Sequence, residues 1–500
     1  MPCDNKLTFN IRQVSKICRY PKQDNMQTKL PAKGQSPALL LQTLESFKAQ
    51  DLPWQSGRVF GYVYDAGAES QQLLRQAYSN FLSENALDPT VFPSLLKLEN
   101  DVVGIAANLL HGDTAVGNFT TGGTESIMLA LKTARDFARE KHPQITQPEV
   151  VLPHTAHAAF HKACHFLGLK PVVIPVDLTT FRAIPEQFVE ATTENTILWV
   201  ASAPSYAHGV IDPIEAIAQL ALQTKVLFHV DACVGGFYLP FAQQLGYPIP
   251  AFDFSVKGVT SMSADFHKFG YAAKGASVVL HHHADMRKYQ LFVNSSWAGY
   301  TMINTTVLST KSGGSLAACW AILHYLGTEG YQQHVAATMQ ATQQIRQHLA
   351  NHPHLFVLGN PDMNLLAIAS RSFSVFRLAD AMRRRGWYVQ PQLASASSVD
   401  NIHLSVNPSN VPHIAEFLQD LDAAVAEIVA EAKPAVDLAP ILAILQSGTP
   451  DALAQISALL GISGQDLPED LEAINTLLSQ LPPAVREFFL KDFANQLYVD

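Results

Sequence analysis

Apolar positions in the middle of the chain form short continuous runs rather than alternating patterns. Five such runs, rich in Val, Ile and Leu, predict strands at residues 150–153, 172–176, 197–203, 226–232 and 276–281. Continuous apolar runs are typical of strands that are buried on both faces of a parallel sheet. Helical periodicity separates these runs, as in residues 127–141 and 213–223. The alternation predicts an α/β fold with a mainly parallel sheet.

The pattern changes toward both ends, and a chain of 500 residues is longer than one core usually needs. We therefore predict four parts. Residues 1–60 form an N-terminal segment with a helix from residue 37, and residues 61–330 form the large domain. Residues 331–431 form a smaller α/β domain. Residues 432–500, which are rich in Ala and Leu and cut by prolines, form a helical extension in which we find no chemistry.

Composition excludes several classes of protein. The net charge of −9 argues against nonspecific nucleic-acid binding. The five cysteines form no CxxC pair, which indicates reduced thiols and a cytoplasmic location. We find no apolar run long enough to span a bilayer and no secretory signal. Three consecutive histidines at 281–283 alternate in direction on an extended chain, so we expect no metal site there.

The strongest candidate for chemistry is Lys268, within the stretch SMSADFHKFGYAAKG. Most lysines are solvated surface charges, but this one lies among small, aromatic and glycine residues, which predicts a pocket. Burial disfavours the charged amine, so we expect Lys268 to lose its proton easily and to act as a Schiff-base nucleophile.

Other polar residues follow the predicted strands or precede helices, where ligands gather in parallel sheets. Asp231 ends one strand; it could pair with a protonated ring nitrogen or form a structural salt bridge. Ser202 lies at the end of another strand. Gly123 and Thr124 open a helix, where free N–H groups suit a phosphate. Lysine, carboxylate and phosphate-binding turn together predict pyridoxal 5'-phosphate as the cofactor.

Two histidines remain ambiguous from the residues alone. His157 lies among small residues, where an imidazole could stack on the cofactor ring or simply occupy the core. His267, next to Lys268, could reach the cofactor phosphate or pack.

Several long blocks resemble the sphingosine-1-phosphate lyases, within the fold-type-I pyridoxal enzymes that include the amino-acid decarboxylases. The resemblance runs from about residue 59 to 421 and is detailed in HVDACVGGF, TTGGTESIMLA, AHAAFHKA, HGVIDP, SGGSLAACW and the stretch around Lys268. It implies a large domain with a seven-stranded, mainly parallel sheet, and a homodimer whose active sites lie at the subunit interface.

The resemblance also implies roles for individual residues. Tyr64 and Lys274 match residues that contact the substrate phosphate and assist carbon–carbon cleavage, and Thr310 matches a serine that reaches the cofactor phosphate from the neighbouring subunit. The remaining matches are Lys268 as the cofactor lysine, Asp231 as the partner of the ring nitrogen, His157 as the stacking ring, and Gly123, Thr124 and His267 at the cofactor phosphate.

This chain departs from the family pattern in places. Asp88 stands where the family has a histidine that helps to hold the substrate phosphate, and a carboxylate repels a phosphate. Lys311 and Ser312 replace an Arg-Pro pair, which keeps the charge but loses the two-pronged grip of arginine. The membrane anchor of the animal enzymes has no counterpart.

The resemblance implies a lyase that cleaves a phosphorylated long-chain or related amino alcohol, a small-molecule amine, to an aldehyde and an amine. An amino-acid decarboxylase is the alternative, because an acidic Asp88 could meet a cationic substrate. A third hypothesis is a catalytically reduced protein whose helical extension binds a partner; the intact lysine and aspartate disfavour it.

Overall fold

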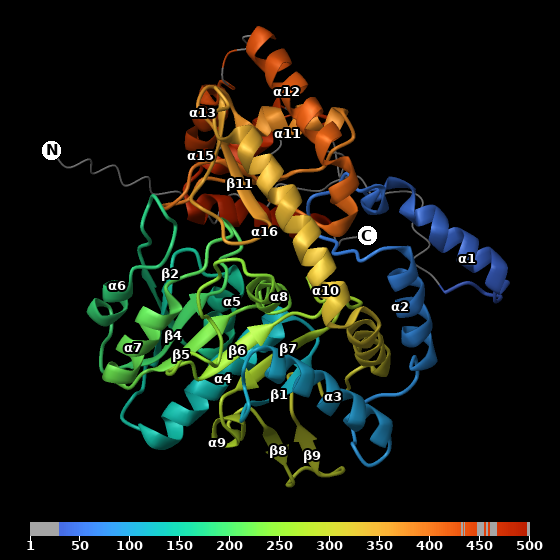
Figure 1. Cartoon of the computed structure of the whole chain (residues 1–500), viewed down its shortest axis with the longest axis vertical. Coiled ribbons are helices and arrows are strands. Elements are labelled where there is room, and N and C mark those ends of the chain that lie inside the picture. Colours follow the sequence, from blue (N-terminus) through green and yellow to red (C-terminus); the bar gives the residue numbers. More distant parts are fainter. Residues whose placement is uncertain are drawn as a thin grey trace.

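The computed structural model describes residues 30–431, 434, 436–447, 455–456, 459–460 and 468–497. A large α/β domain lies below a smaller one in Figure 1, and the long helix α10 (Gly313–Leu349) runs between them.

The large domain is built on a seven-stranded sheet with the order β1-β7-β6-β5-β4-β2-β3. Strand β7 is antiparallel to both its neighbours, and the other pairs are parallel. The predicted α/β fold with a mainly parallel sheet is therefore confirmed, and all five predicted strands are present. The strands are β1 (Val116–Thr120), β2 (Glu149–Pro153), β3 (Lys170–Ile174), β4 (Thr196–Ser202), β5 (Leu227–Asp231), β6 (Ser261–Ala264) and β7 (Ser277–His281).

Both faces of this sheet are buried, which explains the continuous apolar runs. In β4, Leu198 and Val200 join one hydrophobic cluster, whereas Trp199 and Ala201 join another on the opposite face. The first cluster is covered by α4 (Gly123–Lys141) and α5 (Ala158–Leu167). The second is covered by helices that include α2 (Ala68–Asn80), α3 (Pro93–Leu109), α7 (Ile214–Thr224), α8 (Leu239–Gln244) and the first half of α10.

The smaller domain is a four-stranded antiparallel sheet, in the order β10-β11-β13-β12, with α11 (Val375–Arg384) and α12 (Ile414–Glu431) packed on it. Helix α10 bends at Gly327, whose φ of 54° favours glycine, and then contributes its second half to this core. The predicted domain boundary at residue 330 therefore falls inside a helix that contributes residues to both cores. The division into domains at this residue stays a prediction. The strands are β10 (Leu355–Val357), β11 (Leu365–Ser370), β12 (Gln390–Gln392) and β13 (Asn401–Ser405).

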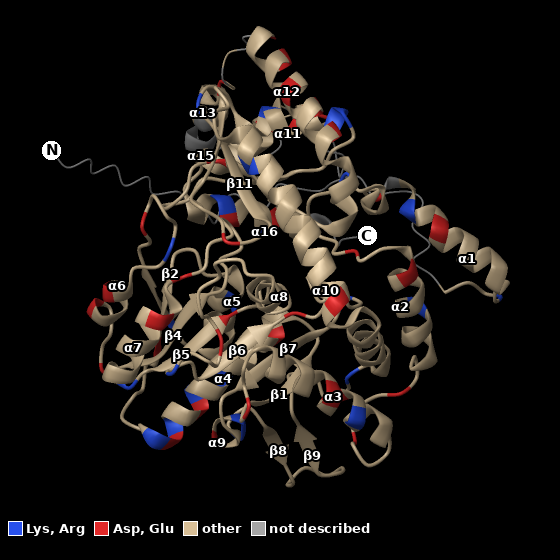
Figure 2. Ribbon diagram, in the orientation of Figure 1, with Lys and Arg blue, Asp and Glu red and all other residues tan. Residues whose placement is uncertain are grey.

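The C-terminal region is helical, as predicted. Its described helices are α13 (Ala439–Ser447), α15 (Glu472–Gln480) and α16 (Pro483–Leu497), which share a small apolar cluster. Ion pairs attach it to α11, with Arg377 Nε 3.0 Å from a Glu472 oxygen and Arg384 Nη1 2.5 Å from Asp470 Oδ1. Over residues 468–497, acidic residues outnumber basic ones. Lys and Arg form no continuous face on α15 and α16 in the view of Figure 2.

The N-terminal helix α1 (Pro37–Ser46) is not buried against any other element of the described residues. None of its residues is buried: Leu41 and Leu44 are 67% and 57% exposed, and Phe47, which follows the helix, is 70% exposed. The helix projects from the body of the molecule in Figure 1. Within the described residues, no helix combines the length and apolar character that a membrane crossing requires.

Candidate active site

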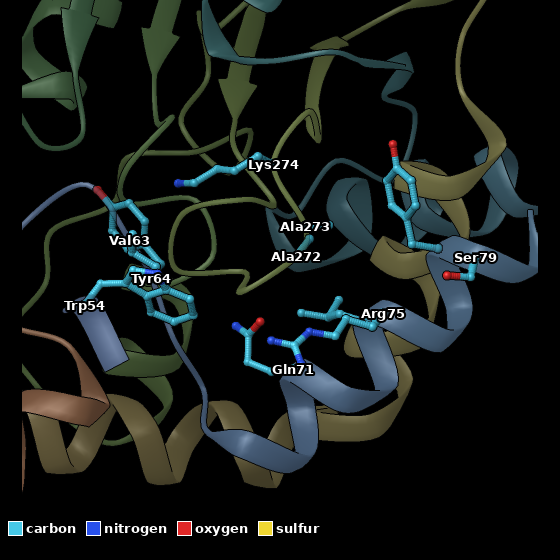
Figure 3. A pocket seen from close by; sticks show the side chains of 11 residues that line it. Trp54, Val63, Tyr64, Gln71, Arg75, Ser79, Ala272, Ala273 and Lys274 are labelled. Atoms are coloured by element: carbon cyan, nitrogen blue, oxygen red, sulfur yellow. The ribbon is translucent and has the colours of Figure 1, made fainter. Parts of the chain in front are cut away.

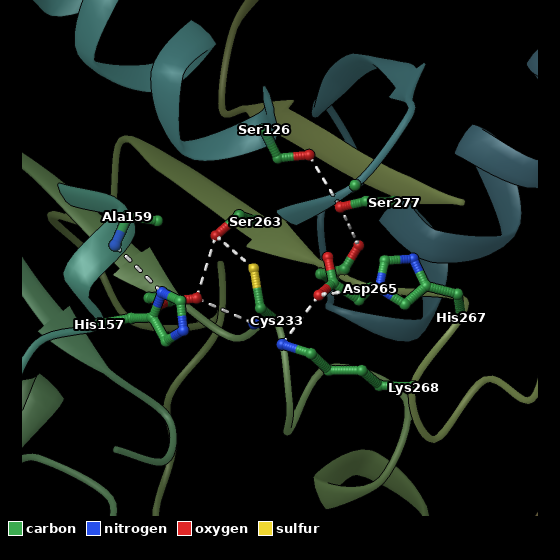
Figure 4. Close-up of polar contacts among 12 residues, drawn as sticks. Ser126, His157, Ala159, Cys233, Ser263, Asp265, His267, Lys268 and Ser277 are labelled. Carbon is green, nitrogen blue, oxygen red and sulfur yellow. Dashed lines mark hydrogen bonds and ion pairs between the residues drawn. The ribbon is translucent and has the colours of Figure 1, made fainter. Parts of the chain in front are cut away.

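One cavity of about 290 Å³ gathers most of the residues predicted to hold a cofactor. It lies where β4, β5 and β6 end and where α4 and α5 begin, because parallel strands present their carboxyl ends at one edge of the sheet. The predicted residues that line it are Gly123, Thr124, His157, Ser202, Asp231, His267 and Lys268. Figure 4 shows His157, His267 and Lys268 close to Asp265 and Cys233.

Lys268 points into this cavity and forms an ion pair that the sequence did not reveal. Its Nζ lies 2.9 Å from Oδ2 of Asp265, a fully buried carboxylate that follows β6. Burial disfavours the charged amine, but the attraction of Asp265 outweighs it, so the pKa of Lys268 is raised. The expectation that burial alone would make Lys268 lose its proton easily is therefore wrong for the cofactor-free chain.

Asp231 presents one carboxylate oxygen that has no donor. Its Oδ1 accepts hydrogen bonds from the N–H of Cys233 at 3.0 Å and from Ser263 Oγ at 3.3 Å. No donor in the described part of the chain reaches Oδ2. A carboxylate oxygen left in this way suits a cationic N–H group in the cavity.

The His157 ring is held in place because His157 caps α5, with its Nδ1 accepting a hydrogen bond from the Ala159 N–H at 3.2 Å. Burial lowers the pKa of His157, which favours the neutral ring. A neutral, fixed imidazole at the cavity wall can stack on a flat ligand.

The start of α4 is open to an anion. Gly122 caps the helix without a side-chain hydrogen bond, which leaves N–H groups of the first turn free. A Cβ atom on Gly123 would lie 2.8 Å from the Asp265 carboxylate oxygens and 2.9 Å from Cys233 Sγ, so only glycine fits. His267 Nδ1 accepts from the Ala276 N–H at 3.3 Å. Its Nε2 lies 3.8 Å from Asp265 Oδ2, beyond hydrogen-bond distance, and can therefore still donate to an anion.

Tyr64 and Lys274 line a neighbouring cavity of about 480 Å³ instead. The Tyr64 ring packs edge-on against Phe269, with centroids 4.8 Å apart, and Lys274 Nζ lies 5.1 Å from the Tyr64 centroid. Burial raises the pKa of Tyr64, and the charge of Lys268 opposes this. Burial, and then the charge of Lys268, lower the pKa of Lys274 to about 8. Both groups therefore lie within electrostatic reach of Lys268.

Asp88 and Thr310 do not reach the Lys268 cavity within this chain. Asp88 lines a third cavity, of about 620 Å³, and its Oδ1 accepts from the N–H and Oγ1 of Thr90 at 2.8 and 2.7 Å. Thr310 is exposed. Lys311 is buried, with Nζ 2.7 and 2.6 Å from the two oxygens of Glu99.

Sequence reasoning missed Tyr206 as well as Asp265. Tyr206 lines the Lys268 cavity, donates a hydrogen bond from its hydroxyl to Gln390 Oε1 at 2.7 Å, and packs on His403 with centroids 4.3 Å apart. The smaller domain thus fixes one wall of the site. The SAPSYAHG stretch after the predicted strand at 197–203 was the available signal.

In the described part of the chain, no group of His, Cys, Asp and Glu side chains is arranged for a metal ion.

Taken together, the cavity fits a flat cofactor that has a cationic ring nitrogen and an anionic group. Asp231 Oδ2 would meet the nitrogen, His157 would cover the ring, and the start of α4 would receive the anion. Lys268 supplies an amine that can bond to an aldehyde.

Comparison with known proteins also indicates a pyridoxal-dependent enzyme. The family model for the pyridoxal-dependent decarboxylase conserved domain matches residues 22–371, and a model for a C-terminal domain of pyridoxal-dependent enzymes, named for a helix-turn-helix, matches residues 415–496. The chain is 40% identical to the sphingosine-1-phosphate lyase of Arabidopsis thaliana over 84% of its own length and 78% of that protein.

Solved structures agree. A sphingosine-1-phosphate lyase from Burkholderia pseudomallei is 34% identical, with a TM-score of 0.78 over 89% of this chain and 98% of that one. A glutamate decarboxylase from Lactobacillus brevis, at 20% identity and a TM-score of 0.72 over 83% of this chain and 97% of that one, shares the fold. This chain therefore belongs to the pyridoxal-dependent decarboxylase family, in its sphingosine-1-phosphate lyase branch, and is a lyase that uses pyridoxal phosphate.

Proposed function

We propose that the chain cleaves the carbon–carbon bond between the amine-bearing and hydroxyl-bearing carbons of a phosphorylated sphingoid base or a related amino alcohol, releasing an aldehyde and an amine. The observation that carries this proposal is one cavity lined by Lys268, Asp231 and His157 in a chain whose relatives are sphingosine-1-phosphate lyases. Pyridoxal phosphate, when bound, withdraws electrons from a bond next to the substrate nitrogen.

Each residue of the cavity has its own role in binding the cofactor. Lys268 provides the amine that attaches it, and Asp231 keeps its ring nitrogen protonated through the free Oδ2. His157 covers one ring face, with Ser202 at the neighbouring strand end. The remaining residues, Gly123, Thr124 and His267, would hold the cofactor phosphate.

Proton transfer falls to Tyr64 or Lys274, which lie beside each other at the edge of the Lys268 site. A pKa of about 8 lets Lys274 exist in both protonation states near neutral pH, whereas the pKa of Tyr64 is raised by burial. Lys274 is therefore the better suited group to exchange a proton with the substrate hydroxyl.

A second copy of the chain completes the site in this proposal. Thr310 and Asp88 lie outside the Lys268 cavity of their own chain, and α1 exposes leucines, which suits an interface with a second subunit. Light scattering on the purified protein should give a dimer. Mixing two inactive variants, Lys268→Ala and Thr310→Glu, should restore up to about a quarter of the activity, because half of the dimers would then hold one intact site. No recovery after subunit exchange would contradict shared sites.

We also propose a cytoplasmic location, because the described cysteines Cys164, Cys233 and Cys319 are free and buried thiols. Cell fractionation tests this directly.

The function itself is tested with a phosphorylated long-chain amino alcohol. The wild-type enzyme should release a long-chain aldehyde, and Lys268→Ala should lose both the cofactor absorbance and the turnover. Asp88→His should increase turnover, because it restores the cationic side chain of the family at that position. Release of carbon dioxide from an amino acid, without aldehyde from the amino alcohol, would instead support a decarboxylase.

A further inference from the structure

The cavity lined by Tyr64 and Lys274 carries two cationic side chains, and no Asp or Glu is among the described residues that line it. It is bounded on one side by Lys274 and the neighbouring residues 272–273, and on the other by helix α2. Arg75 lies on α2, one turn after Gln71, so both side chains lie on the same face of the helix. Figure 3 shows them extending from α2 into the space between the helix and Lys274.

Neither cation is neutralised by a carboxylate in the described part of the chain. Lys274 Nζ donates only to backbone oxygens, of Tyr62 at 3.0 Å and of His267 at 3.5 Å. Arg75 forms no hydrogen bond or ion pair with the described residues, and no Asp or Glu lines the cavity. An exposed arginine is usually only solvated, but two unneutralised cations that face one cavity create a local potential that attracts an anion.

The rest of the lining suits the end of an extended ligand. Trp54 and Val63 form an apolar wall. Lys274 connects this cavity with the Lys268 site, because its Nζ donates to the backbone oxygen of His267, a residue that lines that site. A substrate whose amine is at Lys268 could therefore place a second polar group beside Arg75.

We propose that Arg75 determines substrate specificity by binding, together with Lys274, the anionic phosphate of the amine substrate. This inference rests on the proposed lyase function. Arg75 would also compensate for Asp88. The positive charge that the family's histidine provides at that position would come from α2 instead. The planar guanidinium can donate two parallel hydrogen bonds to phosphate oxygens.

The test compares Arg75→Ala and Arg75→Lys with the wild-type holoenzyme, in which the cofactor already fills its own phosphate site. Gln76→Ala is the matched control, since Gln76 is the next residue of α2 and does not line the cavity. Arg75→Ala should raise KM for the phosphorylated amino alcohol by about tenfold or more, with kcat nearly unchanged, because a charged hydrogen bond is lost. Arg75→Lys should recover part of this loss. Turnover of the non-phosphorylated amino alcohol should be unaffected.

Calorimetry with inorganic phosphate gives a second readout that needs no turnover. Phosphate should bind the wild type and Gln76→Ala but not Arg75→Ala. If the wild type cleaves no phosphorylated amine, the proposed function fails, while phosphate binding that depends on Arg75 would still support the anion site. Equal KM changes for both amines, or phosphate binding unaffected by Arg75→Ala, would overturn the inference.

Discussion

Replacing Lys311 with methionine should destabilise the fold by about 3–5 kcal/mol, because the Glu99 carboxylate would stay buried without its cation. Lys311 is 5% exposed and Glu99 8%, and the ammonium contacts both carboxylate oxygens at 2.7 and 2.6 Å. Glu99 Oε1 also accepts from Asn118 Nδ2 at 2.9 Å and from the Phe119 N–H at 3.1 Å. Because these neutral donors remain, we expect a value near the lower limit, about 3 kcal/mol.

The measurement is the midpoint of urea unfolding, followed by circular dichroism. Lys97→Met is the matched control, since Lys97 lies on α3, the helix that also carries Glu99. Lys97 pairs with Asp101 at 2.9 Å on the surface, where such an ion pair contributes about 1 kcal/mol or less to stability. Adding Glu99→Gln to Lys311→Met should recover much of the lost stability, because it removes the unpaired charge. Equal effects of Lys311→Met and Lys97→Met would refute the reasoning.

Three further predictions address the site and its partner. In the wild type, KM for the phosphorylated amine should rise above pH 8, because Lys274, with a pKa of about 8, is charged below that pH and neutral above it. Lys274→Arg should abolish this rise, since arginine stays charged, and should lower kcat, since arginine cannot exchange a proton with the substrate hydroxyl. Gly123→Ala should cost about 1–3 kcal/mol and lower the cofactor content, because its Cβ would meet the Asp265 carboxylate at 2.8 Å. Its control is Gly104→Ala, a helical glycine with open space around it, whose unfolding midpoint should not fall. Leu41→Glu, at a position 67% exposed on α1, should shift the dimer toward monomer in light scattering without lowering monomer stability; an unchanged dimer would contradict a role for α1 in assembly.

The predictions that succeeded concern residues whose environment is set locally. The strands β2, β4, β5 and β7 were found because a strand buried on both faces needs an unbroken apolar run. The edge strand β3 was also found from its apolar run, although most of its residues are not buried. The strands β1 and β6 were missed, because VGNFT and SMSA contain small and polar residues. Their strand conformation depends on pairing with β7 on either side.

The sequence by itself determined the α/β fold, the pyridoxal cofactor and the set of residues at the strand ends, because a short run of apolar residues and the residue that ends it are neighbours in the chain. Only the tertiary structure decided the charge of Lys268 and the partner of Lys311. Asp265 lies just three positions before Lys268, but its 2.9 Å contact and its burial depend on how the chain turns after β6; Glu99, 2.6 Å from the Lys311 ammonium, lies 212 positions away in the chain. The tertiary structure also brought Arg75 and Lys274, 199 positions apart in the chain, to one cavity. Electrostatic effects depend on separation in space and on burial, and the order of residues fixes neither until the chain has folded.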